Sequence, residues 1–471
     1  MNWLLFSPEL HCLLMAGVFL VLSLLEASPR RDYWTAVILS AVVLGFCLLA
    51  VTARGDLFAA TYRVDLFSQI YKLLLGAGLF LTLCISSELK GIPRRWHSEY
   101  YLLLTVSTLA MMMLVSAVHL VTVFVALELS SYSLYILVAL SRGRGYGLAE
   151  GIKYFLVGAC ASAIMLFGMA LLYGASGEFY LAGLMEALPA MLSRPEVVIG
   201  LFLTLAGFFF KLALFPFHFW APGAYGAAAN QVAAFIATVS KVAAVALLTR
   251  FVALSAGQSP YLVEILAVLA IVSMTVGNLA AVVQTDLKRL LAYSSVAHAG
   301  YVLLGILAAS AWGYAAVLFY AVGLLVMKFT CFFVLVKAAP DGRNLQVAEL
   351  AGLHQRAPIL AMALMLALFG LAGIPPTIGF TGKLLVFTAA IQQGHLILVI
   401  IAMVNVVISL YYYLRVLKAA YLKEPEDPLP ALNISPAANV LALLLMGIMI
   451  GVGIAPNLFI ELTREAVRGL G

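Results

Sequence analysis

The sequence predicts an all-α polytopic membrane protein with about 14 transmembrane helices. Of its 471 residues, 64% are hydrophobic and only 10% are charged, whereas a soluble domain carries about 25% charged residues. The mean hydropathy is +1.08. Apolar segments of about 20 residues, the length that crosses a bilayer, recur along the whole chain with short polar connectors between them. We therefore expect a single membrane domain over residues 1–471.

Each apolar segment defines one expected span. The spans are Leu10–Leu25, Trp34–Thr52, Leu66–Ser86, Tyr100–Ala117, Leu120–Leu140, Tyr154–Tyr173, Val197–Trp220, Ala228–Phe251, Tyr261–Val283, Leu290–Ala309, Tyr314–Lys337, Pro358–Gln392, Leu396–Tyr421 and Ala437–Ile454. The twelfth is expected to break at Pro375 and Pro376, because proline removes a backbone donor and cannot continue a helix. An even number of crossings places both ends of the chain on one side of the membrane.

The positive residues predict which side that is. Connectors and the adjoining span ends on one side hold 16 of the 27 Lys and Arg residues, those on the other side hold 6, and the remaining 5 are assigned to the interior of spans. Cytoplasmic loops are enriched in Lys and Arg, so both termini are expected on the outer, periplasmic side of a bacterial inner membrane. The net charge of +6 is then a matter of topology, and we expect no nucleic acid partner. The five cysteines form no Cys-x-x-Cys pair, so no disulfide, zinc site or iron–sulfur cluster is expected.

One lysine lies in the middle of a long apolar run, within Gly207-Phe-Phe-Phe-Lys211-Leu-Ala-Leu-Phe-Pro216-Phe-His218. A charged lysine at membrane depth costs about 2.5 to 3.5 kcal/mol, which favours a function over chance. Lys211 and His218 are spaced to share a helix face with Phe215, and Pro216 is expected to open the helix beside them. The alternative is a lysine whose ammonium snorkels to the lipid headgroups.

Among the 21 acidic residues, Glu128 is the one expected deep inside the membrane. It forms a polar helix face with Ser131, Tyr132 and Tyr135. It could hold two helices together by hydrogen bonds. Alternatively it pairs with a buried lysine, and such a pair changes its proton occupancy when the separation of the two groups changes.

Two further lysines belong to the same pattern. Lys241 lies on a stripe with Thr238 and Gln231, and Lys383 follows the break at Gly373-Ile-Pro375-Pro376. Each half of the chain thus joins a proline break to a lysine, which indicates an internal repeat built around discontinuous helices.

Other polar residues leave alternatives open. His298 shares a face with Ser294 and Tyr301, and it is either a proton relay or a packed core histidine. Lys328 is either a relay or ion-paired, and Lys72 is expected to snorkel. Asn405, Ser409 and Tyr412 form a further polar face. Glu128, Lys211, Lys241, His298 and Lys383 together suggest a path that passes protons along the membrane plane as well as across it.

These residues resemble the antiporter-like family of membrane subunits in respiratory complex I. The matching segments are Ser7-Pro-Glu-Leu, Thr105-Val-Ser-Thr-Leu-Ala-Met, Leu127-Glu128-Leu-Ser-Ser-Tyr, Phe210-Lys211-Leu-Ala-Leu-Phe-Pro-Phe-His-Phe-Trp-Ala-Pro222, Ser240-Lys241-Val-Ala, Asn278 to Tyr301, and Gly373-Ile-Pro-Pro376-Thr-Ile-Gly-Phe-Thr-Gly-Lys383. The sequence departs from the family at His119, at Lys328 and in the residues that follow Ala221-Pro222.

The resemblance implies two inverted five-helix repeats with broken seventh and twelfth helices. Residues 1–99 would hold three N-terminal helices, 100–251 the first repeat, 261–421 the second, and 437–471 the last helix and a tail. By the same resemblance, Glu128 and Lys211 form an ion pair, Lys241 is the next relay and Lys383 the terminal lysine. His218 and His298 would line the axis between them.

The function implied is proton translocation by a membrane-arm subunit of an NADH:quinone oxidoreductase. No cofactor is expected in this chain, because NADH, FMN, iron–sulfur clusters and quinone would bind to partner subunits of the peripheral and membrane arms. The near alternative is a subunit of a multi-subunit Na⁺/H⁺ antiporter or a membrane-bound hydrogenase. Alternatives from other classes are a stand-alone solute carrier and a structural membrane scaffold.

Overall fold

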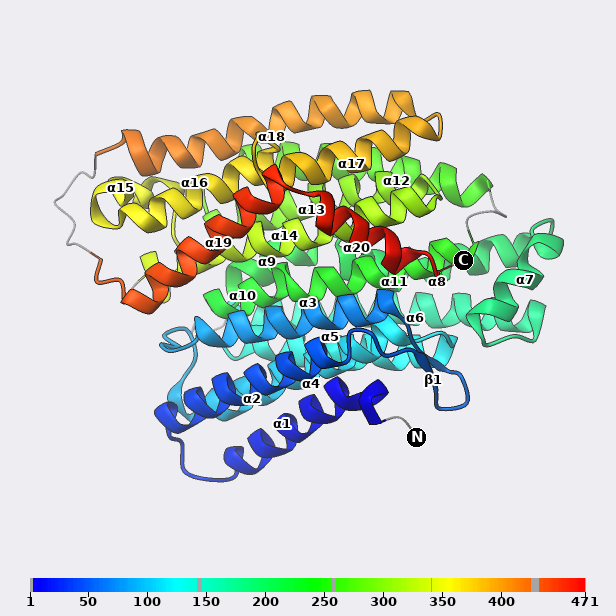
Figure 1. Ribbon diagram of the computed structural model, residues 1–471, viewed down its shortest axis with the longest axis horizontal. Coiled ribbons are helices and arrows are strands. Elements are labelled where there is room, and N and C mark those ends of the chain that lie inside the picture. Colours follow the sequence, from blue (N-terminus) through cyan, green and yellow to red (C-terminus); the bar gives the residue numbers. More distant parts are fainter. Residues whose placement is uncertain (1–2, 142–145, 256–259, 340, 425–431, 471) are drawn as a thin grey trace.

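The computed structural model describes residues 3–141, 146–255, 260–339, 341–424 and 432–470 (Figure 1). The helices are α1 (Ser7–Ser23), α2 (Pro29–Leu49), α3 (Leu66–Cys84), α4 (His97–Ser116), α5 (Leu120–Ala139), α6 (Tyr146–Ser176), α7 (Leu181–Met191), α8 (Pro195–Leu212), α9 (Trp220–Ala227), α10 (Asn230–Ala237), α11 (Val239–Ser255), α12 (Pro260–Val282), α13 (Leu287–Leu307), α14 (Ala311–Ala338), α15 (Leu353–Arg356), α16 (Pro358–Ala372), α17 (Ile378–Gln392), α18 (Leu396–Leu422), α19 (Pro436–Ile454) and α20 (Asn457–Val467). Three short 3-10 helices, η1 (Trp3–Phe6), η2 (Arg94–Trp96) and η3 (Val347–Leu350), complete the helical part.

The predicted class is confirmed. In the described residues, 13 helices are long and apolar enough to cross a membrane, and α16 with α17 supplies the broken twelfth span. Both ends of the chain lie in the right half of Figure 1, toward one end of the bundle, which agrees with an even number of crossings. The side of the membrane on which that end lies stays a prediction.

Several elements lie outside the expected spans, and the three largest are a hairpin and two short helices. An antiparallel hairpin of β1 (Gly55–Leu57) and β2 (Tyr62–Val64) connects α2 to α3. Helix α7 occupies what was expected to be a polar connector, and α20 forms from the expected tail. All three are too short to span a bilayer, so the hydropathy that predicts spans carries no signal for them.

The first helix break lies where proline predicts it, but its geometry differs from the expectation. Helix α8 ends at Leu212, and Ala213 adopts the left-handed conformation with a φ of 56°. Residues 213–219 are not α-helical. The expectation that Lys211, Phe215 and His218 share one helix face is therefore wrong. Pro216, which has no N–H to donate, lies in the middle of this segment.

A second interruption has no proline. Helices α10 and α11 are separated at Thr238, whose φ and ψ are −116° and −75°. Its hydroxyl donates to Ala234 O over 2.6 Å. The expected continuous stripe from Gln231 to Lys241 is thus interrupted, because Thr238 stands between the two helices. At the other expected break, α16 ends at Ala372 and α17 begins at Ile378, as predicted.

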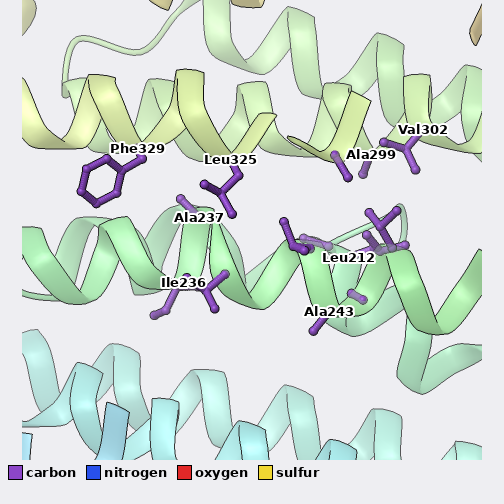
Figure 2. Close-up of a cluster of buried hydrophobic side chains, with 14 of the residues drawn as sticks. Leu212, Ile236, Ala237, Ala243, Ala299, Val302, Leu325 and Phe329 are labelled. Carbon is purple, nitrogen blue, oxygen red and sulfur yellow. The ribbon is translucent and has the colours of Figure 1, made fainter. Parts of the chain in front are cut away.

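The core lies where the two halves of the chain meet. The apolar windows of Asn230–Ala253 and Leu287–Leu307 are each 94% buried, whereas those of α2 and α18 are 28% and 33% buried. Figure 2 shows apolar side chains of α10 and α11, such as Ala237, facing those of α13 and α14, such as Leu325. Polar side chains on these central helices are therefore shielded from lipid on every side.

Candidate functional site

Lys211 lies in the last turn of α8 and is 1% exposed. Its Nζ donates to Ser130 Oγ over 2.8 Å and to Ser131 Oγ over 3.1 Å, both on α5. The two hydroxyls in turn donate to Leu127 O. The ammonium is thus held by neutral oxygens inside the bundle, and the snorkelling alternative is excluded.

Glu128 is buried on α5, one turn from these serines. Its Oε1 accepts a hydrogen bond from Ser162 Oγ of α6. The salt bridges of the described residues do not join Glu128 to Lys211, so the expected ion pair is not a direct contact here. Both groups are instead bonded to serine hydroxyls, which can donate and accept.

Lys241 contacts the main chain of the first break. Its Nζ donates to Lys211 O over 3.0 Å and lies 4.8 Å from the centre of the Trp220 ring. Trp220 Nε1 also donates, over 3.0 Å, to Phe210 O. Carbonyls at the end of a helix have no intrahelical partner and carry partial negative charge. The break in α8 therefore creates the acceptor that holds the Lys241 ammonium.

Lys383 repeats this arrangement in the second half. It is 4% exposed, and its Nζ donates to Leu371 O over 2.8 Å and to Ala372 O over 3.0 Å, at the end of α16. It also lies 4.9 Å from the centre of the Tyr301 ring. Each half thus places one lysine on the carbonyls of a broken helix and against an aromatic face, which agrees with the predicted internal repeat.

His298 lies between two tyrosines. Its Nδ1 is 2.6 Å from Tyr320 OH of α14, and its Nε2 is 3.1 Å from Tyr413 OH of α18. Of the expected partners on its own helix, Ser294 contacts Lys328 instead. The Tyr301 ring does pack against His298, with ring centres 5.7 Å apart, while its OH accepts from Asn278 over 3.2 Å. The sequence did not indicate Tyr320 or Tyr413 as partners of His298, because these contacts depend on the packing of three helices.

The expected polar face of Asn405, Ser409 and Tyr412 has a partner that was not singled out. Asn278 on α12 donates to Asn405 Oδ1 over 3.2 Å, and Tyr412 OH donates to Asn278 Oδ1 over 3.0 Å. Ser409 bonds only within its own helix, to Val406 O. Through these hydrogen bonds Asn278 connects α12 to α18, and it also donates to Tyr301 OH.

Lys328 is hydrogen-bonded and has no acidic partner within salt-bridge distance in the described chain. Its Nζ donates to Leu291 O over 3.0 Å, to Ser295 Oγ over 3.0 Å, and to Ser294 Oγ. Leu291, Ser294 and Ser295 have the same spacing as Leu127, Ser130 and Ser131, and in both cases the serines bond back to the leucine carbonyl. This Leu-x-x-Ser-Ser repeat was a detectable sequence signal.

A small cavity joins the two halves of this set. It has a volume of about 30 Å³, and its lining includes Lys241, His298 and Lys328. A cavity of this size holds one or two water molecules. Three ionisable side chains from α11, α13 and α14 thus share one internal space.

His218 lies in the non-helical segment after α8 and is 3% exposed. Its ring packs against Phe219, with ring centres 4.3 Å apart, and its Nδ1 has no hydrogen-bond partner among the described residues. The structure buries His218 near the break without bonding it to the lysines.

One expectation about the N-terminal helices is wrong. Lys72 does not snorkel: it is 0% exposed and its Nζ lies 2.9 Å from Glu9 Oε1. Glu9, in the first turn of α1, is also 0% exposed and is a buried acid that the sequence did not indicate. Glu9 was missed because it lies one residue before an expected span, and its burial follows from the packing of α1 against α2 and α4.

The comparisons with known proteins define the class. Residues 117–409 match the family model described as NADH:quinone oxidoreductase/Mrp antiporter, TM. That match covers more than half of the chain, which therefore belongs to this family of membrane subunits.

Within the family, the chain is similar to proteins named NADH-quinone oxidoreductase subunit N. The relative from Syntrophobacter fumaroxidans, subunit N 2, is 60% identical over 471 residues and covers 100% of both chains. The one from Opitutus terrae, also subunit N 2, is 41% identical over 97% of this chain and 96% of the relative. The resemblance found in the sequence is confirmed.

Solved structures agree on the fold. A chain of respiratory complex I from Thermus thermophilus aligns with a TM-score of 0.83 at 33% identity, over 96% of this chain and 98% of that one. A chain of the Mrp complex from Dietzia sp. aligns with a TM-score of 0.89 at 22% identity, over 100% and 98%. At that identity the second likeness concerns the fold alone.

Proposed function

We propose that this chain moves protons through the membrane arm of an NADH:quinone oxidoreductase. The observation that carries the proposal is a contact series of buried lysines and a histidine across both halves. Lys211 bonds Lys241 through its main chain, the cavity of about 30 Å³ joins Lys241 to Lys328 and His298, and Tyr301 lies between His298 and Lys383.

The chemistry of this series suits protons. Its members are lysine, serine, tyrosine and histidine, which exchange protons through hydrogen bonds and trapped water. In this proposal Glu128 and His218, which are buried near the first break, also take part in proton transfer. A solute pocket typically measures about 300 to 1,000 Å³, whereas the cavity on the axis measures about 30 Å³. The cavity within the lysine series is therefore too small for a solute of that size.

Energy for this movement would come from partner subunits. In this proposal NADH oxidation and quinone reduction take place on other membrane and peripheral subunits, which bind NADH, FMN, iron–sulfur clusters and quinone. This chain carries out no redox chemistry and receives a conformational or electrostatic signal. Its membrane is the bacterial inner membrane, with both termini on the outer side, as the distribution of Lys and Arg indicates.

The experiment is proton pumping by the intact complex in proteoliposomes, measured together with NADH:quinone reductase activity. We expect Lys211→Met, Lys383→Met and Glu128→Gln to abolish pumping in complexes that assemble. Lys153→Met is the matched control, because the Lys153 side chain is 51% exposed on α6. Undiminished pumping by both Lys211→Met and Glu128→Gln would remove the basis of the proposal.

The fold is shared with a Mrp complex, so a Na⁺/H⁺ antiporter subunit is the second candidate. Purification of the native assembly separates the two. Co-purifying quinone reductase subunits support the first candidate, and an assembly without them, together with sodium-dependent proton movement, supports the second.

A further inference from the structure

A buried charged pair lies outside the lysine series, among the N-terminal helices. Glu9 on α1 and Lys72 on α3 are both 0% exposed, and their charged atoms are 2.9 Å apart. Tyr62 on β2 donates from its OH to the same Glu9 Oε1 over 2.5 Å. Its ring centre is 5.0 Å from Lys72 Nζ. Three elements thus converge on one carboxylate oxygen.

The polar atoms around this pair are incompletely bonded within the described protein. Glu9 Oε2, both amide atoms of Gln69 and Ser116 Oγ are buried without a hydrogen-bond partner there. Gln69 lies one turn before Lys72, and Ser116 precedes Ala117, which pairs with Tyr62. An unsatisfied buried polar atom costs about 1 to 3 kcal/mol, and ordered water normally satisfies such atoms. The unused carboxylate oxygen is therefore in surroundings that suit bound water.

A purely structural pair would not need this arrangement. Two charges buried together recover their desolvation cost only when the remaining lone pairs are also bonded, and an apolar pair of similar volume is often as stable. Here one oxygen of Glu9 accepts from Tyr62 and contacts Lys72, while the other faces no protein donor. Glu9 Oε2 is thus a fixed hydrogen-bond acceptor without a protein donor among the described residues, so a proton can bind there.

The site lies close to an aqueous surface. Glu9 is in the first turn of α1, and Tyr62 belongs to the hairpin at the end of the bundle where both termini lie (Figure 1). Three residues after Tyr62, Asp65 accepts two hydrogen bonds from Arg250, of 2.8 and 2.9 Å. Asp65 also lines an open cavity of about 380 Å³ together with Arg54, Glu465 and Arg468. The charged pair of Asp65 and Arg250 thus lies between this surface cavity and the strand that carries Tyr62.

The same groups join the site to the first repeat. Arg250 belongs to α11, the helix that carries Lys241. Helix α3 packs closely on α11, since a Cβ at Gly78 would lie 3.6 Å from Val239 Cβ and closer still to Cγ2. A change of charge at Glu9 therefore acts directly on Lys72, which belongs to a helix in contact with α11.

We propose that Glu9, Lys72 and Tyr62 form a second proton-binding site that exchanges protons with the aqueous phase at the hairpin end of the bundle and contributes to pumping. A proton from water binds the Glu9 carboxylate at Oε2 and gives the neutral acid, while Lys72 keeps its own proton. Release to water restores the carboxylate. Proton binding stands on the geometry alone, and the contribution to pumping rests on the proposed function.

Proton binding is tested by infrared difference spectroscopy of the intact complex as the pH is changed. We expect a C=O band of a buried protonated carboxyl group that is present in wild type and absent in Glu9→Gln. Ionisable groups on the surrounding elements include His11, Cys12, Cys47, Arg63, Asp65, Tyr71, Tyr101 and Arg250. Asp65→Asn serves as the control that must retain the band. If wild type and Glu9→Gln give the same carboxyl bands at every pH, the pair is structural and the proposal fails.

Pumping is tested with the double variant Glu9→Gln/Lys72→Met, which leaves no unpaired charge. We expect it to assemble and to reduce quinone as wild type does, with at least a twofold loss of protons pumped per electron. Tyr62→Phe, which keeps the ring, gives the same direction of change if the double variant does not assemble. Normal pumping by these variants while Lys211→Met pumps nothing overturns this proposal alone. Normal pumping by Lys211→Met as well overturns the proposed function.

Discussion

Gly373 offers a sharp test of how the second helix break positions Lys383. Gly373 ends α16 with a φ of +89°, and a Cβ there would lie 3.0 Å from Lys383 Cδ and 3.4 Å from its Nζ. A left-handed conformation costs an L-residue about 1 to 2 kcal/mol, and overpacking a tight site adds about 1 to 3 kcal/mol. Gly373→Ala should therefore lower the stability of the native conformation by about 2 to 5 kcal/mol. Part of this cost arises because the new Cβ displaces the Lys383 side chain.

Gly394 separates the two contributions. Its φ is +85°, and a Cβ there would meet nothing within 4 Å, so Gly394→Ala carries the backbone strain alone. The cost of Gly373→Ala should exceed that of Gly394→Ala by about 1 to 3 kcal/mol. This excess weakens the hydrogen bonds from Lys383 to Leu371 O and Ala372 O. Since 1.4 kcal/mol is a tenfold change in an equilibrium, we expect a loss of proton pumping of about tenfold in Gly373→Ala and near-normal pumping in Gly394→Ala. Equal pumping by the two variants, in complexes assembled to the same extent, would refute this account of the break.

Two further predictions concern stability. Burial by itself would raise the pKa of Asp65, but the charge and hydrogen bonds of Arg250 and the bonds from Ser68 hold that pKa below its ordinary value of 3.8. The pair therefore stabilises the fold above pH 4 or so, and this contribution is lost as the pH falls through the lowered pKa. The difference in melting temperature between wild type and Asp65→Asn should shrink below about pH 4, and a constant difference would contradict it. In α6, a Cβ at Gly168 would lie 2.7 Å from Gly200 O of α8, whereas one at Gly174 would meet nothing. Gly168→Ala should cost about 1 to 3 kcal/mol and lower the melting temperature, while Gly174→Ala should leave it unchanged or raise it. Similar melting temperatures would show that α6 and α8 do not pack as described.

The candidate site was only partly predictable. Lys211, Lys241 and Lys383 stand out in any hydropathy reading, because a cation in an apolar run is costly and therefore conspicuous. Their partners do not stand out: the serines that bond Lys211 lie 80 and 81 residues earlier in the chain, and serine is ordinary in a helix. The serine spacing shared by α5 and α13 was the one detectable signal of that contact.

Local chemistry alone determined the class, the order of the spans and the break at Pro375-Pro376. Lipid offers no hydrogen bonds, so each span needs a long apolar run, and a missing N–H is a property of proline itself. Only the tertiary structure decided that α8 stops at Leu212, that Thr238 interrupts the next helix, and that Glu9 pairs with Lys72. Those outcomes depend on which remote carbonyls, hydroxyls and charges the packed helices bring within hydrogen-bond distance, and sequence spacing does not encode that distance.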